Sequence, residues 1–398
     1  MNNNNKNNSN VVRAVSEFYM NMINVEDIFE AYYACLKNKR GTESAVKFEM
    51  NYINNCISLF RDLSDRTYKP SASIAFIVTK PRKREIFAAN FRDRVLHHLV
   101  DLKLRPLIEK ELIDRTFNNR IGKGTSGCVA QLKNDLEDCA QTDWICKMDM
   151  KGFFMSLSKS LIISMVHKLI DDKYIGEDKD DLKWLVEVLI SDCPEKHCNL
   201  RSPVEMWADL DKNKSLFTVD DDLGIPIGNL ISQLFANFYL NEFDHFVHET
   251  LGFEKYGRYV DDFYLIGDKD KILNSIPLMR EKLKEVGVTL HPYKFYLQHA
   301  SKGCEMVGTV VKKNRIYVHN RTVNNAFRKI DRLTQNRRRA TEKDLASVNS
   351  YLGFMGMYSS YSIRRRLAIQ AMKLDGLTAP NNYKKMKLSK QYNYERNK

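Results

Sequence analysis

Three aspartates lie at two places that are far apart in the chain. Asp149 follows a short apolar run, and Asp261 and Asp262 separate two β-rich runs over a hundred residues later. Carboxylates brought together repel one another and raise one another's pKa unless a cation neutralises them. Hard oxygen ligands select Mg²⁺ or Mn²⁺, and two such ions about 4 Å apart are a common device for phosphoryl transfer. We therefore expect one ion to activate an attacking 3′-hydroxyl and the other to hold a triphosphate.

These aspartates need strands that place them side by side. The run 144–148 reads as a strand that ends in Asp149, and the runs 256–260 and 263–266 read as a hairpin with Asp261-Asp262 at its tip. The alternative is an ordinary turn, because aspartate favours bends without any catalytic role. The metal hypothesis requires the two strands to be neighbours in one sheet.

Helical patterns alternate with the strands. Apolar residues recur at helical spacing from Ile162 to Ile170, and further helices are expected over about 229–250 and 271–285. Residues 171–222 are polar and turn-rich, and we interpret them as a long connection. This order predicts an α+β fold with helices on one side of a largely antiparallel sheet.

The positive charge is concentrated at the C-terminal end. The chain has 63 basic and 50 acidic residues, a net charge of +13, and residues 311–398 hold 21 basic and 5 acidic residues. The first 310 residues are slightly acidic, with 42 basic and 45 acidic residues. Apolar residues are interleaved with the C-terminal charges, which favours a nucleic-acid grip over a solvated basic tail.

The chain has no apolar run of about 18–20 residues, and its Asn-rich start lacks the apolar core of a secretion signal. We therefore expect a cytoplasmic protein with no membrane partner. The eight cysteines form no CxxC pair and are expected to be reduced thiols. Cys193, His197 and Cys198 allow a zinc site, but a loop with incidental thiols is favoured because no second ligand pair follows at zinc spacing.

Six blocks between about Ile77 and Gly308 resemble, in order, the motifs of reverse transcriptases. The blocks are Pro81-Arg-Lys-Arg-Glu-Ile86, Met148-Asp-Met-Lys-Gly-Phe-Phe154, Gly224-Ile-Pro-Ile-Gly-Asn-Leu-Ile-Ser-Gln233, Tyr259-Val-Asp-Asp262, Leu290-His-Pro-Tyr-Lys294 and Met306-Val-Gly308. The resemblance implies a right-hand polymerase fold and an enzyme that copies RNA into DNA from dNTPs.

The same resemblance divides the chain. It implies fingers and palm over 67–315 and a basic helical thumb with a C-terminal tail over 320–398. A helical N-terminal extension is expected over 11–66, after a disordered Asn-rich start at 1–10. The template RNA and the RNA/cDNA duplex are the implied partners of the thumb.

Within this family the chain resembles most closely the reverse transcriptases of diversity-generating retroelements (DGRs). The block Pro226–Asn241 resembles their signature, and Tyr256–Phe263 has their usual form. Two departures are Ile231, where that family usually has Thr, and Met306-Val307, where Phe-Leu is common. Neither departure removes a catalytic group.

This closer resemblance implies a bacterial or phage-encoded enzyme that copies a template-repeat RNA into cDNA with errors at adenines. It also implies a small basic oligomeric accessory protein. A retron-like or phage-defence reverse transcriptase is the alternative enzyme. The alternative that is not an enzyme is an inactive RNA-binding scaffold with a polymerase fold. The intact aspartates favour catalysis over this alternative.

The resemblance assigns the metal ligands position by position. Asp149 and Asp261 are the implied ligands of two Mg²⁺ ions, with the Met150 carbonyl nearby and Asp262 as the third carboxylate. Mn²⁺ is the expected substitute ion.

It also assigns the contacts to the nucleotide. Arg84 is implied to hold the triphosphate through its bidentate fork. Phe154 stands at the gate that excludes a ribose 2′-hydroxyl, with a simple core phenylalanine as the alternative. Ile227 stands where other reverse transcriptases carry a Gln that contacts the nucleotide, which fits error-prone copying.

Three further residues complete the implied site. Gly228 permits close backbone approach. Gln233 begins a helix that meets the template strand. Lys294 lies near the pyrophosphate as a charge or proton donor.

Overall fold

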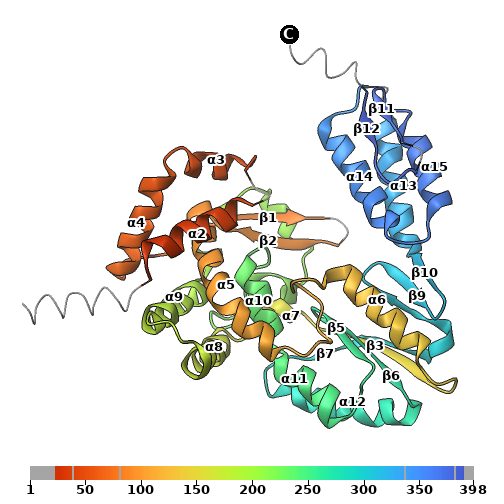
Figure 1. Ribbon diagram of the computed structural model, residues 1–398, viewed down its shortest axis with the longest axis horizontal. Helices are drawn as coiled ribbons and strands as arrows, with labels where there is room; N and C mark the ends of the chain where they lie inside the picture. Colours follow the sequence, from red (N-terminus) through yellow and green to blue (C-terminus); the bar gives the residue numbers. More distant parts are fainter. Residues whose placement is uncertain (1–22, 38–39, 80–81, 336–337, 381, 390–398) are drawn as a thin grey trace, which may run out of the picture.

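The computed structural model describes residues 23–37, 40–79, 82–335, 338–380 and 382–389. Within them the chain forms an α+β structure, as the sequence predicts (Figure 1). The expected disordered start at 1–10 and residues 11–22 lie outside the described residues. No helix in the described ranges is both long and apolar enough to cross a bilayer.

A four-stranded antiparallel sheet, here called the central sheet, carries the three aspartates. Its strand order is β5-β6-β3-β7. The strands are β5 (Tyr256–Tyr259), β6 (Asp262–Gly267), β3 (Trp144–Met150) and β7 (Leu290–His299). The expected pairing of the two aspartate-bearing segments is therefore confirmed: β3 and β6 are direct neighbours.

One face of the central sheet is covered by helices. Met148 of β3 and Phe263 of β6 are buried in the main hydrophobic core, because alternate residues of a strand point to the same face. Among the helices that contribute to this core are α5 (Phe91–Glu111), α8 (Lys159–Lys173), α10 (Leu230–Tyr239), α11 (Asn241–His245) and α12 (Lys269–Lys284).

The expectation that helices cover only one side is wrong at one end of the sheet. There α6 (Gly124–Glu137) packs on the opposite face, where Ile145 and Ile266 join its apolar residues in a second core. Asp149 and Asp262 lie on this same face, toward the other end of β3 and β6 from the residues that pack against α6. The opposite face thus changes from apolar to acidic along β3.

The N-terminal helices pack beside a small sheet. They are α2 (Val25–Leu36), α3 (Glu43–Glu49) and α4 (Tyr52–Ser64), and α2 lies along α5. The small sheet has the order β2-β1-β4, with β1 (Ile74–Val78), β2 (Arg84–Ala88) and β4 (Asn199–Leu200). These three helices lie in the range where the sequence analysis expects a helical extension.

The expected polar connection at 171–222 contains a helix that the sequence interpretation missed. It is α9 (Lys179–Ser191), which packs on α8. Its buried face has helical spacing, but it stands inside a polar, turn-rich segment that the sequence analysis interpreted as one connection. The buried apolar residues are Leu182, Leu185, Val186, Leu189 and Ile190. The rest holds four 3₁₀ turns: η1 (Pro194–Lys196), η2 (Val204–Trp207), η3 (Lys212–Lys214) and η4 (Leu216–Thr218).

The helix expected at 229–250 is broken into pieces. Helices α10 and α11 are followed by a π-helical turn, η5 (Phe246–Thr250). Helix α12 matches the expected helix at 271–285 closely. A single turn of helix, α7 (Phe153–Ser156), follows β3 directly.

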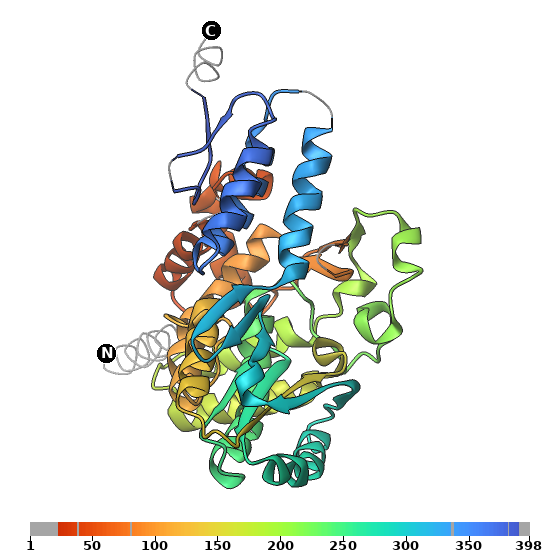
Figure 2. The ribbon, with the colours of Figure 1, turned by 90° about the vertical axis from the view of Figure 1, so that its right-hand side faces the viewer.

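The C-terminal part is a helical unit with its own core, joined to the rest through a three-stranded sheet (Figures 1 and 2). This sheet consists of β8 (Cys304–Met306), β9 (Thr309–Lys312) and β10 (Arg315–Val318), after the short turn η6 (Ala300–Lys302). The helices are α13 (Asn320–Thr334), α14 (Glu342–Gly356) and α15 (Tyr361–Ala371), followed by β11 (Leu377–Thr378) and β12 (Lys387–Leu388). The basic C-terminal helices expected from the sequence are present.

Candidate active site

The predicted aspartates lie close together at one end of the neighbouring strands β3 and β6. Asp149 and Asp262 are directly opposite each other in the β3–β6 register. Val260 and Asp261 form the two-residue turn that joins β5 to β6, since Tyr259 pairs with Asp262. The Met150 N–H donates to the Asp261 carbonyl at 3.1 Å, which ties the turn to β3. Asp261 is thus at the hairpin tip, whereas Asp262 is the first residue of the following strand.

A buried arginine supports this turn. Val260 has a φ of +61°, a conformation that strains a β-branched residue. Arg258 is 1% exposed and donates from Nη1 to the Val260 carbonyl at 3.0 Å. Its Nε donates to Asp244 at 2.7 Å, and the Tyr256 hydroxyl donates to the same carboxylate at 2.6 Å. Sequence reasoning missed this network, although a charged residue inside a β-rich run was its signal.

The three carboxylates are close but do not converge on one point. Their oxygens do not all lie within 4.8 Å of one another. Burial and the charges of Asp262 and Asp149 raise the pKa of Asp261 to about 6. Burial also raises the pKa of Asp262, with Lys147 opposing the rise and Asp149 adding to it. The raised pKa values indicate that the nearby positive charges do not fully neutralise this acidic cluster.

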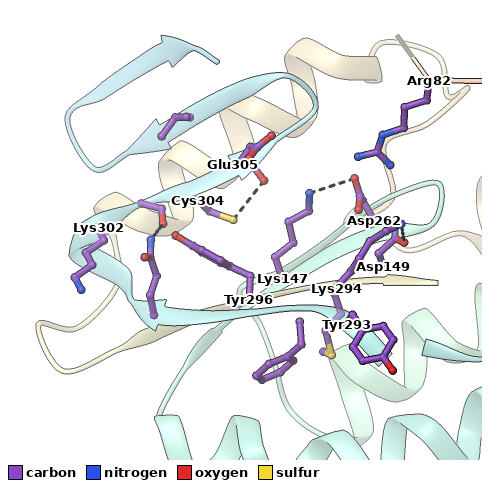
Figure 3. A pocket seen from close by; sticks show the side chains of 15 residues that line it. Arg82, Lys147, Asp149, Asp262, Tyr293, Lys294, Tyr296, Lys302, Cys304 and Glu305 are labelled. Carbon is purple, nitrogen blue, oxygen red and sulfur yellow. Dashed lines mark hydrogen bonds and ion pairs between the residues drawn. The ribbon is translucent and has the colours of Figure 1, made fainter. Parts of the chain in front are cut away.

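Two lysines contact this cluster (Figure 3). The Lys147 ammonium lies 3.2 Å from Oδ2 of Asp262. Lys294 donates to Oδ2 of Asp149 from a part of β7 where the register with β3 shifts between Met148 and Met150. The prediction placed Lys294 near the pyrophosphate, and the structure places it against a carboxylate of the cluster. Lys147 was not singled out from the sequence.

Asp149 and Asp262, together with Lys147 and Lys294, line a cavity of about 440 Å³ between the central sheet and β8, whereas Asp261 is not part of its lining. Arg82, Tyr293 and Glu305 also line it. Carboxylate oxygens are the ligands that a hard divalent cation prefers. Such a cation would neutralise the negative charges that raise the pKa values in this cluster. Met150 is 1% exposed with its side chain in the core, so only its main chain is available to an ion.

The basic end of β2 faces the aspartates. Arg84 is the exposed first residue of β2, and its charge lowers the pKa of Asp261 against the larger opposing effects. Arg82 lines the cavity itself. The sequence prediction of a basic phosphate contact fell on Arg84, and the structure adds Arg82 from the same run.

Phe154 and Ile227 come together although they are far apart in sequence. Both pack against a small apolar cluster that includes Phe87 of β2. Phe154 also lies edge-on to Phe153, with ring centroids 5.6 Å apart. Phe154 is half-buried and packs against the main core as well as the small cluster, so it serves partly as a core residue and stays partly exposed.

Gly228 permits its backbone to come close to another segment, and that segment is β2 of this chain. Its φ is +120°, and a Cβ there would lie 3.0 Å from Ile86 Cγ2 and 3.1 Å from the Phe87 carbonyl oxygen. The neighbouring Ile227 carbonyl accepts from the Phe87 N–H at 3.1 Å. The glycine therefore lets the 224–229 segment pair with β2. Gln233 is half-buried on α10, among neighbours that are buried.

The alternative zinc set does not assemble as a unit. His197 bonds to Asp192 at 2.8 Å, and Lys159 donates to the Cys193 thiol at 3.2 Å. Among the described residues, the group whose ligand atoms do lie together is Cys193, Glu195 and Asp221. Lysines contact two of its three members, which fits the loop interpretation made from the sequence.

Comparison with known proteins identifies the family of the chain. A family model described as "Reverse transcriptase (RNA-dependent DNA polymerase)" matches residues 78–311, which include both aspartate segments. The chain therefore belongs to the reverse transcriptase family.

Two individual proteins show a weaker similarity to this chain. Protein YkfC of Escherichia coli (strain K12) is 22% identical over 160 residues, which cover 40% of this chain and 35% of YkfC. The chain thus matches about a third of the length of that relative. A solved structure of apo telomerase from Candida tropicalis has a TM-score of 0.45 and 11% identity, covering 77% of this chain and 63% of that one.

Proposed function

We propose that this protein synthesises DNA on an RNA template, with Asp149, Asp261 and Asp262 holding two divalent ions. The observation that carries the proposal is the register that places Asp149 opposite Asp262, with Asp261 in the adjoining turn. On this proposal the central sheet is the palm and the small sheet belongs to the fingers. The C-terminal helical unit is the thumb.

The residues around the cavity have distinct tasks in this reaction. The aspartates orient the primer terminus and the nucleotide through the ions they hold, and Arg84 with Arg82 binds the triphosphate. Lys294 supplies a charge or a proton toward the leaving pyrophosphate. When bound, Mg²⁺ or Mn²⁺ lowers the pKa of the attacking 3′-hydroxyl and stabilises the charge of the leaving group. Phe154 and Ile227 shape the nucleotide pocket beside β2.

Primer extension on an RNA template with Mg²⁺ tests this proposal. We expect Asp261→Asn to reduce incorporation by at least about 10³-fold, because preorganised charge supplies most of the rate. Asp270→Asn is the matched control, since Asp270 is an exposed aspartate on α12. Equal incorporation by the wild type and Asp261→Asn would leave the inactive RNA-binding scaffold as the better account.

We further propose that the template is a template-repeat RNA and that copying is error-prone at adenines, as in DGRs. The support is the signature-like block 226–241 and the apolar Ile227 beside the predicted nucleotide site. An apolar side chain removes a hydrogen-bond check on the new base pair. A small basic accessory protein is the partner that this proposal adds to RNA and dNTPs.

Two observations separate this proposal from a retron-like or phage-defence enzyme. A near-identical repeat pair that differs at template adenines is expected beside the gene, and its absence favours the alternative. Ile227→Gln is expected to lower misincorporation opposite adenine by several-fold in sequenced cDNA. Unchanged misincorporation would remove Ile227 from the mutagenic mechanism.

A further inference from the structure

Glu85 is a buried carboxylate on the strand that also carries Arg84. It is 1% exposed, because neighbouring residues of β2 point to opposite faces and Arg84 takes the exposed one. Burying a charged carboxylate costs free energy unless hydrogen bonds compensate for the lost water. Burial raises the pKa of Glu85, and its hydrogen bonds oppose that rise. The donors around Glu85 therefore make its burial possible.

Three donors from one distant segment bond to this carboxylate. The segment is 204–218, here called the strap, and it includes η2, η3 and η4. The Trp207 indole N–H donates to Oε2 of Glu85 at 2.6 Å, and the Ser215 hydroxyl donates to the same oxygen at 2.7 Å. The Leu216 N–H donates to Oε1 at 2.8 Å. These bonds fasten the strap to β2, and Figure 2 shows this part of the chain, in light green, beside the orange strands of the small sheet.

The strap also contacts the turn of helix that carries Phe154. η3 and α7 are neighbours, and Gly152 precedes α7 with a φ of +57°. A Cβ on Gly152 would lie 2.7 Å from the Asn213 carbonyl oxygen, which is closer than a side chain can approach. The strap therefore lies directly against the start of α7, two residues before Phe154.

The strap contributes to the small apolar cluster beside the proposed nucleotide pocket. Leu216 is buried there with Phe87 of β2. The ring of Phe217 lies 5.8 Å from that of Phe87, between centroids. Phe154 and Ile227 pack against the same cluster. The strap thus joins β2, α7 and these two residues in one packed unit.

We propose that Glu85 is a positioning residue that fixes the strap between β2 and α7 and thereby sets the places of Phe154 and Ile227 at the nucleotide. This inference rests on the proposed function, because only a polymerase has an incoming nucleotide to select. Glu85 points away from the face of β2 that carries Arg84, so it acts through the strap. Loss of its bonds should loosen the selection of the nucleotide while the three aspartates stay in place.

Single-nucleotide incorporation by the full chain on an RNA template, with dNTP and with rNTP, tests the inference. Glu85→Gln keeps the shape of the side chain but turns one acceptor oxygen into a donor amide, which then faces donors of the strap. We expect it to raise both KM for dNTP and the ratio of rNTP to dNTP incorporation by about fivefold or more, with a smaller change in kcat. Trp207→Phe removes one donor on the strap and should shift both quantities in the same direction. Glu205→Gln is the matched control and should shift neither, because Glu205 is an exposed residue of the same strap.

A purely structural role of Glu85 gives a different result. A partly unfolded sample contains fewer active molecules, which lowers the apparent kcat and leaves KM and the incorporation ratio unchanged. Hydrogen exchange of the peptide that contains Leu216 reports on the strap without any activity, and it should be faster in Glu85→Gln. Unchanged exchange, or faster exchange with an unchanged KM and ratio, overturns the inference. A wild type that incorporates no nucleotide contradicts the proposed function itself, and this inference fails with it.

Discussion

The guanidinium of Arg258 donates a hydrogen bond of 3.0 Å to the carbonyl oxygen of Val260, inside the turn that carries Asp261. The same guanidinium forms an ion pair with Asp244, and both side chains are fully buried. The turn that carries Asp261 is thus fastened to α11, in the helical layer behind the central sheet. Its strained backbone is held by a network that has no contact with the cavity.

Arg258→Met should therefore destabilise the protein and disturb the turn. Removing one partner of a buried ion pair leaves Asp244 uncompensated, which costs about 3–5 kcal/mol of unfolding free energy. Urea unfolding measures this loss, and Arg258→Met with Asp244→Leu should recover a large part of it. A loss below about 1 kcal/mol would mean that the pair does not fasten the turn.

Asp261→Asn should stabilise the metal-free protein, and more so at high pH. The pKa of Asp261 is raised to about 6, so the folded state keeps a proton that the unfolded state has lost. Stability therefore falls as pH rises from the ordinary pKa of about 4 to about 6, and the full cost remains above that. With EDTA at pH 8 we expect a Tm increase of roughly 2–4 °C, the shift that about 1 kcal/mol produces.

The control for this prediction is the same pair of melting curves recorded at low pH. At pH 4 the carboxyl is protonated in the folded state and about half protonated in the unfolded state, so most of the increase should be lost. Adding Mg²⁺ at pH 8 should raise the Tm of the wild type and leave Asp261→Asn unchanged. An increase that is the same at pH 4 and pH 8 would contradict a charge-based cost at this position.

Gly228→Ala should weaken the pairing between the 224–229 segment and β2. A non-glycine residue at this φ is strained by about 1–3 kcal/mol, and its Cβ would press on Ile86 and the Phe87 carbonyl. We expect a matching loss of stability and at least about a tenfold loss of kcat/KM for dNTPs. Gly353→Ala on α14 is the control, since a Cβ there meets nothing within 4 Å and should stabilise the helix by about 0.5–1 kcal/mol.

Phe154→Ala tests the proposed 2′-hydroxyl gate against the simple core role. If the ring excludes ribose by size, the ratio of rNTP to dNTP incorporation should rise by at least about tenfold. Single-nucleotide incorporation at low temperature measures the ratio while the variant remains folded. A loss of stability with an unchanged ratio would assign Phe154 to the core alone.

The sequence by itself determined the local pieces of this protein. The β-rich runs around Asp149 and Asp261 and the stripe from Ile162 to Ile170 predicted strands, a hairpin and a helix correctly. These features depend on near neighbours in the chain, so periodicity reveals them. Helix α9 has a similar stripe and was missed because the polar residues 171–222 around it were interpreted as one connection.

The tertiary structure decided how the pieces meet. No local pattern shows that Lys147 reaches Asp262, that Gly228 faces β2, or that Arg258 supports the catalytic turn. Each of these contacts joins separate segments or depends on the conformation of a turn. Register and side-chain direction arise only when the sheet and its covering helices bury their apolar faces together.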